Sequence, residues 1–453
     1  MLPSSLRSLI AYNILFPGED LLRRVPINKF FRFYRKAQWW SREENDRYKQ
    51  AALKRLIQHA YQTVPYYHRT MKKAGIVPDD IREPGDLSKL PFLTRKDVLE
   101  NLQDLISTDH SIETLKKGAS SGSTGQVVVS YRTRTAIGAA FGAERIGWEM
   151  AGYRFGARNV TVWGNRITVE EQWTTWHSRL KQWAYRNKRI GAYLLTDDRH
   201  VRDALKTIHD WRPDYLNGYP NAIYFLALKA KEFGVGGLAC KGVLTTAETV
   251  YDFQRAMIGE VFGPVYDGYG SGEISGVAYQ CKAGGFYHIV EPHVIVEYAD
   301  CGGDEFKELV LTNLDNYGMP FIRYKVGDLA VLANETCSCG RHWATLKKIA
   351  GRTADLITTP TGGALLVPSF FGSSLISQLP KIQQYQIAKV TPNRITIRIQ
   401  ASPHLSQVEL DLIRRQIAPH LEGKIEYDIE QVEKIALTKA GKFKLVIDET
   451  KPL

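Results

Sequence analysis

Cysteine, long apolar runs and low-complexity tracts are scarce in this chain, and each scarcity excludes a class of protein. Five cysteines among 453 residues are too few for a disulfide framework, so we expect a reduced, cytoplasmic protein. The sequence has no apolar run of about 18 residues, which excludes a membrane-spanning helix. It also lacks a zinc-finger array, an RNA-recognition motif and a basic tail, so nucleic acid is not the expected partner.

The composition instead indicates a large globular protein with excess positive charge. With 44% hydrophobic residues, the chain is long enough for two or three domains with real cores. The 60 Lys and Arg residues against 48 Asp and Glu give a formal net charge of +12. This surplus favours an anionic partner such as a nucleotide, a coenzyme, an acidic polysaccharide or a membrane surface.

Residues 23–36 mix cations with aromatic side chains and leave two interpretations open. Six Lys and Arg residues interleave with Phe30, Phe31, Phe33 and Tyr34. Such a segment can lie against anionic lipid, which would make the protein membrane-peripheral through residues 1–40. The alternative is a basic amphipathic helix that packs on the body of the protein.

The hydrophobic pattern predicts three regions along the chain. Residues 1–115 are expected to be mainly helical, with an extended segment at Pro91 and with Thr94 capping a helix that starts at Arg95. Residues 116–350 alternate short apolar strands with helical stretches, which is typical of a parallel or mixed α/β sheet. Residues 351–453 are expected to form a small α+β domain.

Individual elements of the second and third regions can also be placed. We expect strands at 160–163, 215–220, 243–246 and 261–266, and helical structure at 170–188 and 221–233. In the third region the alternation over 382–399 predicts a half-buried hairpin, 406–421 an amphipathic helix, and 424–429 a strand.

The most informative motif is the loop Ser120-Ser121-Gly122-Ser123-Thr124-Gly125, directly ahead of a β-rich run. Glycines let backbone N–H groups curl around an anion, and hydroxyls add further donors, so the loop is suited to phosphate. It lacks the lysine of a P-loop, which excludes that class of nucleotide site. Taken alone, the loop is equally compatible with a plain solvated turn.

Four further motifs follow the loop in order. They are Tyr269-Gly270-Ser271-Gly272-Glu273, Arg323-Tyr324-Lys325-Val326-Gly327-Asp328, Gly351-Arg352-Thr353-Ala354-Asp355 and Leu437-Thr438-Lys439-Ala440-Gly441-Lys442. In this order the five motifs resemble the adenylate-forming acyl ligase superfamily, most closely its branch of phenylacetate-CoA ligase-like and CapK-like capsule-biosynthesis proteins. The resemblance extends to the N-terminal segments 59–67 and 90–97.

The resemblance implies a fold and a set of residue roles. The fold is α/β, with a large multi-sheet N-terminal adenylation domain and a smaller mobile α+β C-terminal domain. In the family, Ser120 to Gly125 cover the triphosphate of ATP and Glu273 holds Mg²⁺. Tyr269, Gly270 and Ser271 border the adenine and acyl pocket, Asp328 accepts from the ribose hydroxyls, and Arg352 lies beside ribose and phosphate. Lys442 reaches the α-phosphate and the carboxylate.

Each of these residues also has a plain structural interpretation. Glu273 can cap a helix, Asp328 can be a turn residue, and Lys442 can be a surface lysine. The sequence departs from the family at Ala354, where many relatives carry an aspartate at the hinge. By analogy with the family, candidates for the acyl pocket are Tyr219, Phe225, Thr246, Ala247, Glu248, Tyr266 and Gly268.

The cysteine spacing predicts a second site. Cys337 and Cys339 form a compact two-thiol turn, and Cys281 has His288 seven positions downstream. Three sulfurs and one imidazole suit a closed, tetrahedral, structural Zn²⁺ site, and some members of the family carry zinc at matching places. The alternative is a set of buried thiols with a core histidine, as we expect for Cys240 and Cys301.

These features lead to two hypotheses of different classes. The first is an ATP- and Mg²⁺-dependent ligase that converts a carboxylic acid into an acyl-adenylate. It then passes the acyl group to coenzyme A or to an amine acceptor, in capsule or surface polysaccharide biosynthesis. The second is a non-catalytic, nucleotide-binding or scaffold member of a polysaccharide-assembly complex.

Overall fold

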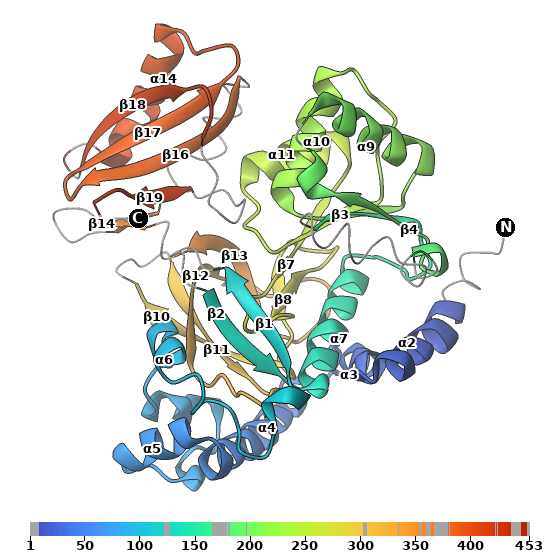
Figure 1. Cartoon of the computed structure of the whole chain (residues 1–453), viewed down its shortest axis with the longest axis vertical. Helices are drawn as coiled ribbons and strands as arrows, with labels where there is room; N and C mark the ends of the chain where they lie inside the picture. Colours follow the sequence, from blue (N-terminus) through green and yellow to red (C-terminus); the bar gives the residue numbers. More distant parts are fainter. Residues whose placement is uncertain are drawn as a thin grey trace.

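The computed structural model describes most of the chain (Figure 1). The described residues are 9–121, 127–164, 179, 182–195, 197–301, 306–333, 335–352, 356–358, 364–366, 379, 381–421, 423, 425–435 and 445–450. Within them, none of the helices combines the length and the apolar character that crossing a bilayer requires.

Helices dominate the N-terminal region, as predicted. They are a π-helical turn (Ala11–Leu15), α2 (Phe16–Arg23), α3 (Ile27–Ala37), α4 (Arg42–Thr63), α5 (Pro65–Lys73), α6 (Arg95–Glu100) and α7 (Arg134–Met150), with 3₁₀ turns at Pro78–Asp80, Pro84–Lys89 and Ile112–Thr114. Pro65 separates α4 from α5 and occupies the first turn of the latter, where its missing N–H costs nothing. Thr94 caps α6 in a reciprocal capping box with Asp97, as the sequence predicted.

One large sheet of 11 strands forms the centre of the molecule. Its parallel part is β3 (Asn159–Trp163), β4 (Asn187–Gly191), β5 (Tyr215–Gly218), β6 (Gly242–Thr246) and β7 (Val265–Tyr269). Its antiparallel part is β8 (Ala278–Gln280), β9 (Tyr287–Ile289), β10 (Val294–Asp300), β11 (Lys307–Asn313), β12 (Tyr324–Leu332) and β13 (Thr345–Arg352). The strand order is β10-β11-β12-β13-β9-β8-β7-β6-β5-β3-β4, so the two parts join at β7.

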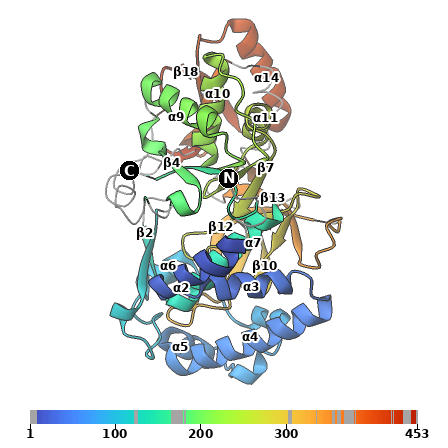
Figure 2. The ribbon, with the colours of Figure 1, turned by 90° about the vertical axis from the view of Figure 1, so that its right-hand side faces the viewer.

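Among the described residues, the helices that flank the parallel part are α9 (Asp198–Trp211), α10 (Pro220–Glu232) and α11 (Asp252–Val261), with a 3₁₀ turn at Ala192–Leu194 (Figures 1 and 2). Two sequence predictions are wrong here. The strand expected at 261–266 begins only at Val265, because Val261 still belongs to α11 and a turn follows. Residues 187 and 188, expected to be helical, lie in β4, where they pair in parallel with Asn159 and Val160.

The C-terminal region has its own sheet and its own hydrophobic core. Strands β16 (Ile382–Thr391), β17 (Arg394–Ala401), β18 (Glu426–Val432) and β19 (Val446–Asp448) form a four-stranded sheet, accompanied by α14 (Gln407–Leu421). A two-stranded ladder of β14 (Leu356–Thr358) and β15 (Ala364–Leu366) precedes them. The α+β character matches the prediction, whereas the boundaries at 115 and 350 remain predictions.

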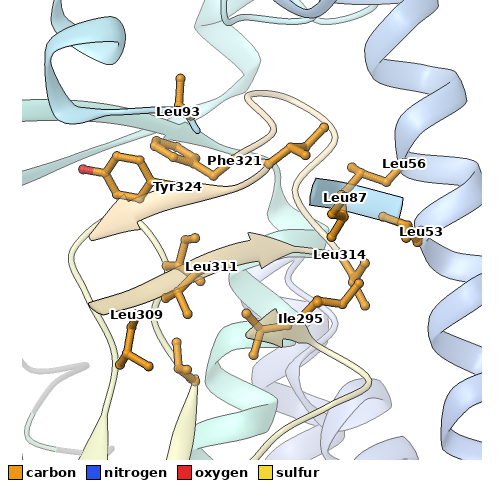
Figure 3. Close-up of a cluster of buried hydrophobic side chains, with 14 of the residues drawn as sticks. Leu53, Leu56, Leu87, Leu93, Ile295, Leu309, Leu311, Leu314, Phe321 and Tyr324 are labelled. Atoms are coloured by element: carbon orange, nitrogen blue, oxygen red, sulfur yellow. The ribbon is translucent and has the colours of Figure 1, made fainter. Parts of the chain in front are cut away.

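A hydrophobic cluster lies between the N-terminal helices and the antiparallel strands, which carry candidate site residues described below (Figure 3). Leu53 and Leu56 of α4 and Leu309 and Leu311 of β11 belong to this cluster and are fully buried. Leu93 joins this core and forms a parallel bridge with Tyr324 at the start of β12. The segment at Pro91 is therefore extended because it adds to the sheet.

The aromatic side chains of residues 30–34 pack on the body of the protein, as the second interpretation of this segment proposed. Phe31 and Tyr34 are buried, and α3 lies against α7. A Cβ atom at Gly142 of α7 would lie 2.7 Å from the Cβ of Phe30, so the close approach of the two helices requires glycine there. Phe31 and Tyr34 are therefore not free to contact lipid, and Phe30 and Phe33 are half-buried.

Candidate functional site

The predicted phosphate loop joins the two strands of a hairpin. Strands β1 (Lys116–Ser121) and β2 (Val127–Arg132) are antiparallel, and Ser121 pairs with Val127 across the tip. The tip itself, Gly122 to Gly125 with Ser123 and Thr124, lies outside the described residues, as do the side chains of Ser120 and Ser121. The base of the hairpin is tied to the turn before β12, because the side-chain amide of Asn316 donates to the carbonyl of Tyr131 at 2.9 Å.

Three of the predicted site residues contact one another directly. The hydroxyl of Tyr269 donates to Oδ2 of Asp328 at 2.9 Å, and both side chains are buried. Nε of Arg352 lies 3.1 Å from Oδ1 of the same carboxylate. Arg352 is half-exposed while Asp328 is buried, so the guanidinium group lies on the solvent side of this ion pair.

Curvature of the large sheet explains how these residues meet. In the hydrogen-bonding order β12 is four strands from β7, which in a flat sheet is about 19 Å. A direct bond from Tyr269 to Asp328 therefore requires the sheet to curl over on itself. Strand β13 makes this possible, because it pairs with β9 only through Thr345 and Leu346 and carries Arg352, at its other end, to Asp328.

Glu273 lies in the loop that follows β7 and is buried. The loop is closed by the N–H of Ser271 donating to the carbonyl of Ile274 at 2.8 Å. Gly270 is needed there, since a Cβ would lie 2.9 Å from the backbone nitrogen of Gly276. The hydroxyl of Tyr324 lies 3.4 Å from Oε1 of Glu273. Glu273 thus faces the same region as Asp328.

Burial sets the protonation of this group of side chains. It raises the pKa of Asp328, and Arg352 and the Tyr269 hydroxyl partly offset the rise by stabilising the carboxylate. Burial raises the pKa of Tyr269 well above its usual value, and the neighbouring Asp328 adds to the effect. Tyr269 therefore remains a hydrogen-bond donor at neutral pH.

Two side chains near Glu273 had no role assigned from the sequence. Tyr324 lies inside the Arg323–Asp328 motif, and burial followed by the charge of Glu273 raises its pKa. Arg132 is the last residue of strand β2, at the end of the hairpin away from the loop, and burial lowers its pKa while Glu273 opposes the shift. Gly118 makes room for Arg132, because a Cβ there would lie 2.8 Å from its Nη2 atom. The signal for Arg132 in the sequence was a cation at the end of the β-rich run that follows the glycine-rich loop.

The acyl-pocket candidates separate into two groups. Tyr219 stacks on Trp163 with ring centroids 4.0 Å apart, and Glu248 accepts from the backbone N–H of Asn221 close by. Burial, followed by Glu248, raises the pKa of Tyr219 to about 12. Phe225 instead packs in the core beside the parallel strands. Tyr266 packs with another cluster, and its direction alternates with that of Asp267 and Tyr269 along β7.

The C-terminal motif and the hinge are not part of this geometry. Lys442 lies outside the described residues, and so do Thr353, Ala354 and Asp355. Their assignments remain predictions from the sequence.

The four predicted metal ligands converge. The ligand atoms of Cys281, His288, Cys337 and Cys339 all lie within 4.8 Å of one another. Cys281 Sγ is 3.4 Å from Cys337 Sγ, and Nε2 of His288 is 3.4 Å from Cys339 Sγ. A Cβ at Gly284 would come within 2.9 Å of the Cys337 sulfur, so glycine is required beside the cluster.

The chemistry of this cluster fits a tetrahedral zinc ion. Burial, followed by the charge of Arg341, lowers the pKa of His288 to about 4, which leaves the neutral imidazole that binds metals. His288 pairs with Thr345 at one end of β13, whereas Arg352 lies at the other end, about 23 Å away for seven residues of strand. A metal here would therefore be remote from the candidate adenylation site.

Known proteins resemble the chain over most of its length. No family model matches it. A phenylacetate-coenzyme A ligase of Thermus thermophilus is 27% identical over 350 residues, covering 74% of this chain and 76% of the relative. Protein CapK of Staphylococcus aureus is 22% identical over 393 residues, covering 85% of each.

A solved structure has the same fold. The crystal structure of 2-hydroxyisobutyryl-CoA ligase with 2-HIB-AMP, in the postadenylation state, matches with a TM-score of 0.71 at 19% identity and covers 90% of both chains. The fold, the order of the motifs and these relatives agree. The chain is thus similar over most of its length to adenylate-forming ligases of the phenylacetate-CoA ligase-like and CapK-like branch, and these relatives support an AMP-forming synthetase of the acid–thiol ligase type.

Proposed function

We propose that the chain uses ATP and Mg²⁺ to activate a carboxylic acid as an acyl-adenylate and then passes the acyl group to coenzyme A. The observation that carries this proposal is the convergence of Tyr269, Asp328 and Arg352, with Glu273 facing the same region. These residues come from separate motifs and meet only because the sheet curls. Relatives that are phenylacetate-coenzyme A ligases support the choice of acceptor.

In the first step a carboxylate oxygen attacks the α-phosphorus, and the bond to pyrophosphate breaks. Asp328 accepts from the ribose hydroxyls, which places the nucleotide, and Arg352 at its side offers a cation to the phosphate. Glu273 supplies a hard carboxylate oxygen of the kind that Mg²⁺ prefers. When bound, the metal neutralises charge on the phosphate oxygens. Lys442 stabilises the charge on the α-phosphate and the attacking carboxylate.

In the second step the thiolate sulfur of coenzyme A attacks the acyl carbonyl carbon, and AMP leaves. An amine nitrogen can attack the same carbon, releasing a proton, so an amine acceptor is the alternative. Similarity to CapK supports a role in capsule or surface polysaccharide assembly. The product would then be an acyl group activated for transfer to a polysaccharide precursor.

We also propose that Cys281, His288, Cys337 and Cys339 hold a structural Zn²⁺ ion. The ligand types and their mutual distances support zinc, and all four positions of a tetrahedral ion would be filled by protein. Such a site would stabilise the fold and take no part in the reaction.

Pyrophosphate release from ATP across a panel of aryl, fatty, amino and sugar acids tests the proposal. We expect release with one class of acid, ATP-dependent thioester formation with coenzyme A that releases AMP, and a loss of roughly 100-fold or more in the Lys442→Ala variant. Lys439→Ala, three residues earlier in the same motif, is the matched control and should retain activity. Silence with every acid, unchanged nucleotide binding and no effect of Lys442→Ala would instead favour a non-catalytic scaffold.

A further inference from the structure

The outer face of α2 is apolar, which is unusual for a surface helix. Phe16 and Glu19 point inward: Phe16 is fully buried, and only 10% of the Glu19 side chain is exposed. Leu21 and Leu22 fall on the opposite side of the helix and are 80% and 87% exposed. Among the described residues, these are the two most exposed large hydrophobic side chains. A surface helix normally places polar residues on this face.

A tryptophan lies in the segment that packs against the same helix. The hydroxyl of Tyr185 donates to Oε2 of Glu19 at 2.8 Å, and its ring stacks on Phe16 with centroids 6.0 Å apart. Trp183, two residues before Tyr185, is 78% exposed. Helix α2 and strand β4, which follows this segment, share the right-hand side of Figure 1, the side that Figure 2 faces. We call the exposed pair Leu21 and Leu22 the N-terminal apolar patch, and Trp183 is a further exposed apolar side chain on the adjoining segment.

The two segments that carry these exposed side chains are rich in positive charge. These segments, 9–41 and 182–195, contain nine Lys and Arg residues and two acids. Both acids face inward: Glu19 bonds to Tyr185 and Arg145, and Asp20 accepts from the backbone N–H of Asn28 at 2.8 Å. Arg23 and Arg24 directly follow the two leucines; Nε of Arg23 lies 3.1 Å from Oε1 of Glu19 with the side chain still about half exposed, and Arg24 is exposed. The exposed charge here is therefore positive.

We propose that the N-terminal apolar patch docks the protein on an anionic phospholipid bilayer. Leucines and a tryptophan enter the interface between headgroups and acyl chains, and arginines beside them pair with lipid phosphates. This surface differs from the aromatic segment 30–34, whose rings pack on the body of the protein. The two leucines and the arginines that follow them lie on one short helix, which is the arrangement of a shallow interfacial anchor. Membrane docking of this kind is independent of the acid that the enzyme activates.

Sedimentation of the full chain with vesicles tests the proposal. We expect it to bind vesicles of phosphatidylcholine with phosphatidylserine, to bind pure phosphatidylcholine vesicles weakly, and to be released by high salt. The double variant Leu21→Ser with Leu22→Ser should bind the anionic vesicles about tenfold or more weakly. Val408→Ser is the matched control, because Val408 is 73% exposed on the C-terminal helix α14.

A charge variant separates the electrostatic part. Arg24→Gln with Lys29→Gln should weaken binding to anionic vesicles, whereas Lys54→Gln with Lys96→Gln, which removes exposed cations elsewhere, should not. Trp183→Ala gives a second apolar test if the leucine variant fails to fold. No binding to anionic vesicles at low salt, or equal losses in patch and control variants, would overturn the proposal. So would a concentration-dependent dimer that only the leucine variant abolishes, since it would assign the patch to a second copy of the chain.

Discussion

Asp267 and Asp328 are both buried carboxylates, yet their surroundings give them different tasks. Asp328 forms an ion pair with the half-exposed Arg352 and accepts a hydrogen bond from the Tyr269 hydroxyl. Asp267 receives two hydroxyl donors, from Thr245 at 2.6 Å and from Tyr287 at 2.7 Å. Burial raises its pKa to about 6 in spite of these bonds. Asp328, with Arg352 at its side, is placed to accept from a ligand, whereas Asp267 ties strands β6, β7 and β9 together.

The raised pKa of Asp267 predicts a pH dependence of stability. The folded state holds this proton up to about pH 6, while the unfolded chain releases it near 3.8. Stability from this group is therefore largest at low pH and falls as the pH rises through about 4 to 6. Relative to wild type, Asp267→Asn should gain about 1 kcal/mol in unfolding free energy between pH 5 and pH 7.

Urea unfolding midpoints of wild type and variant at the two pH values measure this gain. Asp300→Asn is the control, because the bond from Lys307 lowers the pKa of that exposed carboxyl and moves its titration below this window. A difference between Asp267→Asn and wild type that is the same at pH 5 and pH 7 would contradict the assignment.

Among the elements, the short helix α6 shows how a local signal serves the site. Its capping box is complete: the N–H of Asp97 donates to Oγ1 of Thr94 at 3.2 Å, and the N–H of Thr94 donates to Asp97 at 2.8 Å. The residue before the cap, Leu93, bonds to β12 through the carbonyl of Arg323 and the N–H of Lys325, both at 2.9 Å. The cap therefore fixes where α6 begins relative to Tyr324.

Removing this cap should destabilise the part of the protein that contains α6 and the large sheet, without changing the reaction that the enzyme catalyses. Thr94→Ala leaves an N–H of the first turn without its acceptor, which costs about 1 kcal/mol. We expect a lower urea midpoint with the substrate preference unchanged. Thr207→Ala should leave the midpoint nearly unchanged, because that exposed hydroxyl bonds to the carbonyl of Asp203 within α9. Equal midpoints for the two variants would refute the role of the cap.

Across the whole molecule, the cysteine and histidine cluster links parts of the chain that are far apart in sequence. Its ligands come from the β8–β9 connection, from β9 and from the turn before β13. Arg341, next to this turn, donates to Oε1 of Gln38 at 2.7 Å and lies over the ring of Trp39. A metal here would therefore connect the central sheet to the N-terminal helices.

Loss of the metal should lower the stability of this connection. Purified protein should contain about one zinc per chain, and Cys337→Ser should contain much less and unfold at a lower temperature. Cys240→Ser is the matched control, since that thiol bonds to the carbonyl of Phe262 at 2.9 Å and belongs to another core. Metal analysis and thermal unfolding measure both effects. Full zinc content in Cys337→Ser would exclude this cysteine as a ligand.

Local patterns in the sequence were sufficient to predict most elements and the composition of both candidate sites. The Thr94 cap, the 382–399 hairpin and the four metal-ligand types follow from short-range spacing, because turns, caps and strand periodicity depend on neighbouring residues. The motif order likewise indicated the family. Predictions failed where neighbouring elements share one apolar run, as at 261–266, which holds the end of α11 and the start of β7.

Only the tertiary structure decided which of these residues meet and which are exposed. The curl of the sheet brings Tyr269 of β7 to Asp328 of β12, a contact between strands that are not neighbours. Packing of α3 on α7 buries Phe31, and packing of α2 through Phe16 leaves Leu21 and Leu22 exposed. Burial by distant segments also sets the pKa of Asp267. The sequence by itself determined the elements and the chemistry that they carry, whereas contacts, exposure and pKa depend on long-range packing that local periodicity does not encode.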